Sequence, residues 1–182
     1  IRVAFRNKGH DAWSCDIKMD ELMLTGHPGS REYHIHGDVL DHLDEGWDMM
    51  IGHPPCTFMC RNRSKLNERE NVNIDTGLFM SLLNSNIDKI CIENPVPSLA
   101  ANLPRYTQIV QPYQFGHDHS KKTCLWLKNL PKLKPTKVVE VTYITTMNGY
   151  KYTRGWYKTP RNSTARSRTF VGIAKAMAGQ WG

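Results

Sequence analysis

A cysteine behind two prolines is the strongest chemical signal in this sequence. Cys56 follows a Gly-His-Pro-Pro stretch over residues 52–55, and the two proline rings stiffen the backbone that presents it. A thiolate is a strong nucleophile, and we expect the basic neighbours His53, Arg61 and Arg63 to lower the pKa of this thiol. The alternative interpretation is a structural cysteine beside a rigid turn.

A glutamate supplies an acid partner for this cysteine. Residues 89–95 are an apolar stretch that ends in Glu93, Asn94 and Pro95, and a carboxylic acid in an enclosed site can donate a proton. Attack of a thiolate on carbon 6 of a pyrimidine ring, with protonation of N3, makes carbon 5 an enamine carbon that can accept a methyl group. Cys56 and Glu93 together therefore predict chemistry on a pyrimidine base.

Alternating strand and helix patterns must position these residues. Helical spacing predicts helices and apolar runs predict strands. The expected helices cover residues 1–8, 73–83 and 173–177, and the expected strands cover 11–17, 33–40, 47–52, 89–95, 108–112 and 123–127. This order predicts an α/β fold with a mainly parallel sheet, whose strands bind ligands at their carboxyl ends.

Two acids stand at ends of the expected strands. Asp16 is placed to accept hydrogen bonds from ribose hydroxyls, and Asp38 is placed near an adenine amino group one strand over. In a mainly parallel sheet these acids open onto the same edge as Cys56 and Glu93. The alternative is that each aspartate caps a local turn or helix.

The charge divides the chain into two halves of opposite sign. Residues 121–182 carry 13 Lys and Arg against one acid, whereas residues 1–120 carry 11 Lys and Arg against 16 acids. The basic half also contains Trp156 and several tyrosines. Cations interleaved with aromatic rings indicate a surface that follows a phosphate backbone and stacks on bases. The alternative is a basic face that only improves solubility.

Other classes of protein and site are disfavoured by composition. The sequence has no apolar run near the ~20 residues of a membrane span, so a membrane protein is excluded. Five cysteines, an odd number without a Cys-x-x-Cys pair, favour a reducing, cytosolic compartment over a disulfide framework. The spacings of histidine and cysteine match no common zinc pattern, so no metal site is expected.

The order of these motifs resembles that of DNA cytosine-5 methyltransferases, specifically the short phage and prophage members. The resemblance covers nearly the whole chain. Its motifs are Cys-Asp-Ile at 15–17, Gly-Asp-Val-Leu at 37–40, Pro-Pro-Cys-Thr at 54–57, Glu-Asn-Pro at 93–95, a glycine segment at 115–121 and a closing segment at 166–170 with the final helix. Thr57 stands where the family has glutamine, and Pro95 where it has valine.

The resemblance implies a Rossmann-like S-adenosylmethionine-dependent methyltransferase fold, with a mainly parallel sheet, helices on both faces and a small basic insert. Residues 1–127 would be the catalytic core, with its first strand and glycine loop upstream of residue 1. Residues 128–165 would be the insert, a possible target-recognition segment, and residues 166–182 would return to the core.

The resemblance also assigns roles to individual residues. Cys56 would be the nucleophile and Glu93 the proton donor, with Asn94 shaping the loop and Lys121 replacing the family's arginine. S-adenosylmethionine would be the cofactor, and the target base would leave the duplex stack to reach the cysteine. The residues expected to bind the cofactor are Asp16, Ile17, Asp38, Val39 and Pro54.

DNA, double- or single-stranded, is the expected partner of a monomeric protein in the cytoplasm of a bacterial or phage-infected cell. The residues expected to contact it are Arg61, Arg63, Lys132, Lys134, Lys137, Lys151, Arg154, Lys158, Arg166 and Arg168. Two alternatives stay open. One is a methyltransferase acting on the amino group of a base, which needs neither Cys56 nor Glu93. The other is a nucleic-acid-binding relative without catalysis.

Overall fold

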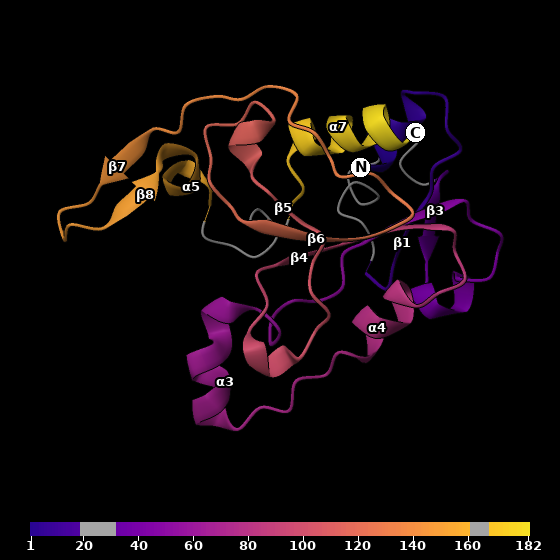
Figure 1. The fold of residues 1–182 in the computed structure, drawn as a ribbon, viewed down its shortest axis with the longest axis horizontal. Coiled ribbons are helices and arrows are strands. Elements are labelled where there is room, and N and C mark those ends of the chain that lie inside the picture. Colours follow the sequence, from indigo (N-terminus) through magenta and orange to yellow (C-terminus); the bar gives the residue numbers. More distant parts are fainter. Residues whose placement is uncertain (19–31, 161–167) are drawn as a thin grey trace.

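The structure is a computed structural model, and it describes residues 1–18, 32–160 and 168–182 (Figure 1). Its helices are short. They are α1 (Arg2–Arg6), α3 (Ser64–Glu70), α4 (Gly77–Leu83), α5 (Arg154–Lys158) and α7 (Val171–Trp181), with single 3-10 turns η1 (Val39–His42), η2 (Arg61–Arg63), η3 (Leu99–Ala101) and η4 (Pro112–Gln114).

The described strands form three sheets. A four-stranded sheet has the order β3-β4-β6-β5, from β3 (Met49–Gly52), β4 (Lys89–Pro95), β6 (Thr123–Lys128) and β5 (Gln108–Val110). Two further pairs stand apart from it: β1 (Ser14–Asp16) beside β2 (His34–His36), and the hairpin of β7 (Tyr143–Thr145) and β8 (Lys151–Thr153).

The expectation of a Rossmann-like, mainly parallel sheet is wrong. The chain is a small mixed α/β protein whose four-stranded sheet contains one parallel pair, β3 with β4, while β6 runs antiparallel to both β4 and β5. The β7–β8 hairpin is antiparallel as well. Apolar runs mark where strands lie, but their direction depends on how the chain returns to the sheet, and the sequence pattern does not encode that.

The core lies on both sides of the four-stranded sheet because β4 and β6 are apolar on both faces. Ile90, Ile92 and Trp126 pack with α4 in one cluster, and Cys91 and Leu125 pack in another with α1 and α7. Figure 1 shows α7 above this sheet and α4 below it. The strand β4 is therefore anchored firmly, and its carboxyl end is held in a defined place.

Several expected elements are confirmed, some with shorter bounds and some with the same or longer ones. The helix expected at 1–8 is α1, and the chain turns away at Gly9, where φ is +89°, a conformation that glycine adopts without strain. The strand expected at 89–95 is β4 with the same bounds. The elements not expected are α3, α5 and the β7–β8 hairpin, which have no clear hydrophobic period.

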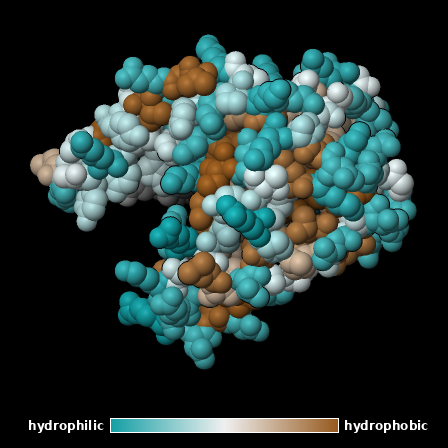
Figure 2. Space-filling view, in the orientation of Figure 1, coloured by the Kyte–Doolittle hydropathy of each residue, from teal (hydrophilic) through white to brown (hydrophobic). Residues whose placement is uncertain are grey.

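The hairpin projects from the body of the molecule. It lies at one end of the fold with α5 beside it, and α3 lies across a gap below it (Figure 1). Figure 2 shows that the molecular surface is hollowed between these two projections, with hydrophilic side chains along much of the rim. By contrast, the expected basic insert at 128–165 begins in the core, because its Leu133 is 1% exposed. Within the described part of the chain, no helix has the length and apolar character needed to cross a bilayer.

Candidate active site

Cys56 and Glu93 come from neighbouring parallel strands. In the register of β3 and β4, Gly52 lies opposite Ile92, so the loop that starts at residue 53 and the last residues of β4 leave the sheet at the same edge. Gly52 packs closely against side chains, since a Cβ there would lie 2.9 Å from Ile92 Cδ1 and 3.2 Å from Leu82 Cδ1. The parallel pairing of β3 with β4 holds the two strand ends side by side.

The two loops that follow these strands are joined by backbone hydrogen bonds. The N–H of Arg61 donates to the carbonyl of Val96 over 2.9 Å, and the N–H of Ser98 donates to the carbonyl of Met59 over 2.8 Å. Cys60 also pairs with Pro97 as an isolated bridge. The cysteine loop is thus held against the chain that leaves Glu93.

The Cys56 thiol is half-buried, and its surroundings raise its pKa. Burial is the main cause, and the nearby Cys60 thiol and Glu93 carboxylate add to it, while a backbone hydrogen bond and the Lys121 ammonium act in the opposite direction. The expectation that basic neighbours lower this pKa is wrong, because burial outweighs the lowering effect of the Lys121 ammonium. Cys56 is therefore a protonated thiol at neutral pH, and it needs a base before it can attack.

Glu93 has a histidine as its direct partner. Its Oε2 lies 3.2 Å from Nδ1 of His53, and the side chains of Glu93 and His53 are 20% and 39% exposed. The two residues are 40 positions apart in sequence. A carboxylate beside an imidazole forms a pair that can accept a proton and return it.

Asn94 is a buried link between the two strand ends. It is 2% exposed, and its Nδ2 donates to the carbonyl oxygen of Pro54 over 3.3 Å. Pro54 is itself buried and lies two residues before Cys56. The Asn94 amide thus ties the proline pair that positions the nucleophile to the strand that carries the acid.

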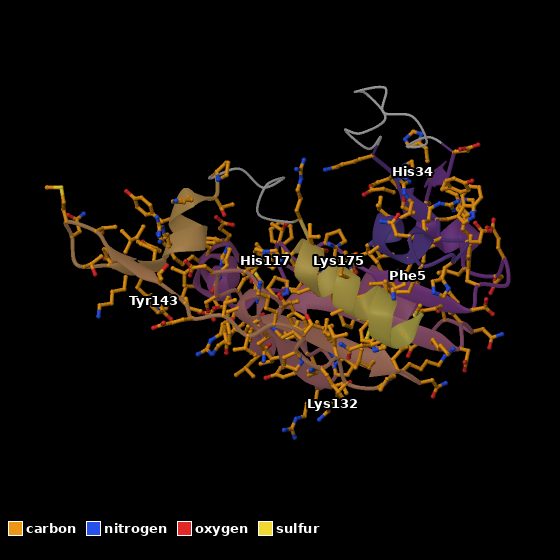
Figure 3. All side chains as sticks on the ribbon, turned by 90° about the horizontal axis from the view of Figure 1, so that it is seen from above. Phe5, His34, His117, Lys132, Tyr143 and Lys175 are labelled. Atoms are coloured by element: carbon orange, nitrogen blue, oxygen red, sulfur yellow. The ribbon has the colours of Figure 1, made fainter. Side chains whose placement is uncertain are left out.

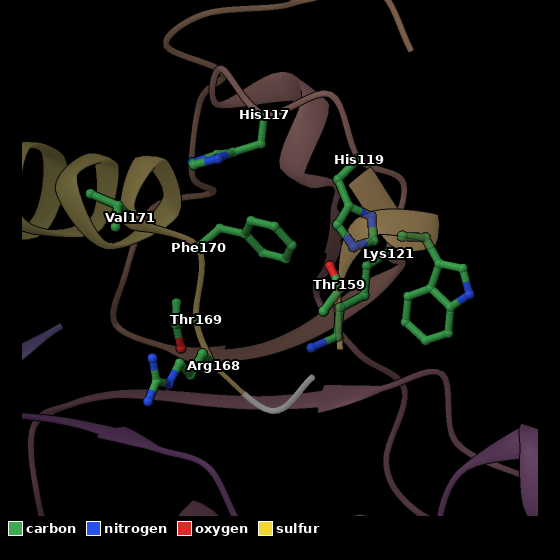
Figure 4. Close-up of a pocket in the computed structure, with 9 residues that line it drawn as sticks. His117, His119, Lys121, Thr159, Arg168, Thr169, Phe170 and Val171 are labelled. Carbon is green, nitrogen blue, oxygen red and sulfur yellow. The ribbon is translucent and has the colours of Figure 1, made fainter. Parts of the chain in front are cut away.

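Lys121 connects this site to a cavity of about 230 Å³ that contains a second cation, Arg168 (Figure 4). The walls also include Trp156 and Phe170. Lys121 comes from the loop before β6, and Trp156 comes from α5. Arg168 and Phe170 come from the segment before α7. The cavity therefore gathers cations and aromatic rings from three parts of the chain beside the catalytic candidates.

The two acids expected at a cofactor site both hold local backbone. Asp16 Oδ1 accepts a hydrogen bond from the N–H of Lys18 over 2.8 Å, and Asp38 Oδ1 accepts one from the N–H of Leu40 over 3.0 Å, which caps η1. Both carboxylates are exposed near the ends of the parallel strands β1 and β2. Each can therefore still accept a hydrogen bond from a hydroxyl group of a ligand. Ile17 is 69% exposed, and Val39 packs against the core below η1.

The expected DNA-binding cations lie on more than one surface. Lys151, Arg154 and Lys158 are exposed on the hairpin and α5, beside the hollow of Figure 2. Lys132 points outward elsewhere, well away from Tyr143 of the hairpin (Figure 3). The remaining cations divide as follows: Lys134, Lys137, Arg61 and Arg168 are exposed, whereas Arg166 and the side chain of Arg63 lie outside what the structure describes.

Sequence reasoning missed the partner of Glu93 and two histidines of the cavity. His53 was considered for its effect on the thiol, although it contacts the carboxylate. His117 and His119 line the cavity, although no role was predicted for either of them. The sequence does place His117 and His119 within four residues of Lys121. No pattern in the sequence shows which of these side chains face the cavity.

The part of the chain that the structure describes shows neither a metal-like cluster nor a disulfide at this site. Across residues 1–18, 32–160 and 168–182, no three His, Cys, Asp or Glu side chains group as a metal site, and all five cysteines are free thiols. The function must be inferred from the residues described above. Comparison with known proteins finds no matching family model, no matching curated protein and no matching solved structure.

Proposed function

We propose that this protein transfers a methyl group to carbon 5 of cytosine in DNA through a covalent bond to Cys56. The observation that supports the proposal is the convergence of a thiol, a carboxylate and an ammonium group. Glu93 and Lys121 both lie close enough to Cys56 to change its pKa, in opposite directions. A nucleophile, an acid and a cation are the groups that addition to a pyrimidine ring requires.

The raised pKa of Cys56 sets the order of proton movements. The thiol must lose its proton as it attacks, and the Glu93 carboxylate, supported by His53, is the base at hand. The sulfur then forms a bond to carbon 6 of cytosine, and the protonated Glu93 gives the same proton to N3. The proton moves from sulfur to N3 by way of one carboxylate, and carbon 5 becomes an enamine carbon.

S-adenosylmethionine is the proposed methyl donor, and when bound it supplies an electrophilic methyl group. The carboxylates of Asp16 and Asp38 fit its ribose and adenine as hydrogen-bond acceptors, because both are exposed at the ends of paired parallel strands. After carbon 5 has taken the methyl group, its own proton passes to solvent, Glu93 takes back the proton on N3, and the bond between carbon 6 and sulfur breaks. The sulfur then regains that proton from Glu93, which restores the aromatic ring and the free Cys56 thiol.

Binding of DNA is attributed to the cations beside the hollow between the β7–β8 hairpin and α3 (Figure 2). The hairpin and α5 on one side carry Lys151 and Lys158, and α3 on the other carries Lys65 and Arg69. Lysine and arginine side chains attract a phosphate backbone. We assign this activity to the cytoplasm of a bacterial or phage-infected cell, where free cysteines stay reduced.

The test is covalent trapping on DNA that contains 5-fluorocytosine, with the intact protein and S-adenosylmethionine. Fluorine at carbon 5 cannot leave as a proton does, so the enzyme stays attached to its target base. We expect an adduct that peptide mass spectrometry maps to Cys56, which Cys56→Ala abolishes and the matched variant Cys60→Ala retains. DNA binding without any adduct would overturn the proposal.

A second candidate function is nucleic-acid binding without catalysis, and the raised pKa of Cys56 favours it. A thiol that stays protonated reacts slowly, and the cations beside the hollow do not depend on it. The two functions differ in the cofactor: a protein that only binds DNA gives no heat with S-adenosylmethionine in a calorimetric titration, whereas the methyltransferase binds it saturably.

A further inference from the structure

The cavity beside Lys121 has walls suited to a nucleotide. Its lining includes the aromatic residues Trp156 and Phe170 and the cations Lys121 and Arg168, and Figure 4 shows the Phe170 ring near His119. The volume of about 230 Å³ is below the roughly 300–1,000 Å³ of pockets for drug-sized ligands. It suits one small unit with a flat face and a negative charge.

A buried histidine in the wall keeps a polar atom for a ligand. His119 is 4% exposed, and its Nδ1 has no hydrogen-bond partner among the described residues. Burial is the main cause that lowers the pKa of His119, and Lys121 and His117 add to it, while a backbone hydrogen bond at Ser120 and the Asp118 carboxylate act in the opposite direction. The net lowering leaves the ring neutral near pH 7. A buried polar atom without a partner is costly, and a ligand that hydrogen-bonds to it removes that cost.

The ring of His119 is fixed by its aromatic neighbours. It meets the Phe170 ring edge-on at 4.9 Å and the Trp156 ring at 5.9 Å between centroids. His117 is fixed too, since its Nε2 accepts a hydrogen bond from the N–H of Gly172 over 2.9 Å. The wall is thus assembled before any ligand arrives.

Two glycines allow α5 and α7 to pack closely against the loop at residues 115–118. A Cβ on Gly155 of α5 would overlap the carbonyl oxygen of Asp118, and a Cβ on Gly172 of α7 would overlap that of Phe115. Both helices therefore approach the backbone of the 115–118 loop more closely than any other residue permits. These two approaches hold α5 and α7 against the loop that carries His117, which lines the cavity.

We propose that this cavity binds one unpaired nucleotide of single-stranded DNA, next to the target cytosine, with its base against Trp156 and its phosphate between Lys121 and Arg168. The inference rests on the proposed function, since it names the form of DNA that the site takes. A phosphate is the ligand group that lysine and arginine side chains in one lining favour. Only an unstacked base can offer its face to an indole, which a base inside a duplex cannot do.

The experiment measures fluorescence anisotropy of a fluorescein-labelled 12-nucleotide single strand and of a blunt duplex of the same sequence. We expect Trp156→Ala to weaken binding of the single strand roughly 5- to 150-fold, the range for loss of one stacked base, with a smaller effect on the duplex. Trp156→Phe retains a flat ring and restores most of the affinity. Arg168→Gln lowers the slope of log affinity against log salt by about 0.7.

Two matched controls lie away from the cavity. Trp13→Ala makes the same change at an indole that is 41% exposed beside β1, and Lys89→Gln removes one exposed charge at the start of β4. Neither should alter the affinity for the single strand by more than about twofold. Circular dichroism of every variant checks that the fold is kept.

The outcomes separate this inference from the proposed function. If Trp156→Ala and Arg168→Gln bind the single strand as the parent does, or weaken strand and duplex equally, the cavity does not hold an unpaired nucleotide. In that case a 5-fluorocytosine adduct at Cys56 would still support the methyltransferase. Conversely, weaker binding of the single strand by both variants without any adduct would support the nucleotide site and reject the enzyme.

Discussion

Replacement of Asn94 by alanine tests whether the two halves of the candidate active site are joined as described. The variant removes the amide that donates to the Pro54 carbonyl over 3.3 Å and leaves that acceptor buried without its partner. Loss of one partner in a buried hydrogen bond costs about 1–3 kcal/mol of unfolding free energy. Since Asn94 is 2% exposed, water cannot replace the amide and the cost is not reduced by solvation.

The assay is thermal and urea unfolding followed by circular dichroism. For a chain of 182 residues, 1 kcal/mol corresponds to about 2–4 °C in Tm, so Asn94→Ala should lower Tm by roughly 2–12 °C. Asn94→Asp should cost more, because a carboxylate cannot donate to the Pro54 carbonyl and its charge is buried. The control is Asn84→Ala at the exposed C-cap of α4, which should change the unfolding free energy by less than about 0.5 kcal/mol.

A second readout links this bond to the chemistry. If Asn94 positions the proline pair, the alanine variant should form the 5-fluorocytosine adduct more slowly while it still binds DNA. If Asn94→Ala and Asn94→Asp both match the parent in stability and in the rate of adduct formation, the link between the strand ends does not exist and the reasoning is refuted.

Four further predictions follow from other contacts. Alkylation of Cys56 by iodoacetamide, mapped by mass spectrometry, should keep rising above pH 9, because burial raises the pKa of the thiol above its usual value of 9.0; a plateau at neutral pH would contradict this. Glu93→Gln should speed that alkylation at a fixed pH, since it removes a negative charge beside the thiol, yet slow methyl transfer by about 10²–10⁴-fold as a lost acid–base group does; radiolabelled methyl incorporation measures the second effect. Leu133→Ala should cost about 2–5 kcal/mol in urea unfolding because the side chain is 1% exposed, and a cost below 1 kcal/mol would show that this part of the basic segment does not pack in the core. Burial lowers the pKa of His117 and His119 in the folded state, so stability is full above about pH 6.5 and falls as pH drops below it; the urea midpoint should therefore fall between pH 7.5 and 5.5, and fall less in His119→Gln.

The sequence by itself was sufficient for some of the local elements of the fold. Short-range rules end α1 before Gly9 and place β4 at 89–95, because helix termini and buried strands depend on residues adjacent in the chain. The sequence also singled out Cys56 and Glu93, since proline-flanked cysteine and an acid after an apolar run are visible without a structure. The residues of α3 and of the β7–β8 hairpin have no clear hydrophobic period, so these elements could not be predicted.

Only the tertiary structure determined the direction of the strands, the contacts of each side chain and the protonation state of Cys56. β6 runs antiparallel to its neighbours because the chain returns to the sheet through the 111–122 loop, and no residue pattern encodes that path. His53 meets Glu93 from 40 positions away, and the pKa of Cys56 rises because folding buries it. Contacts between distant residues and the loss of water around a charge exist only after the chain has folded, so these properties could not be predicted from residue types and spacing.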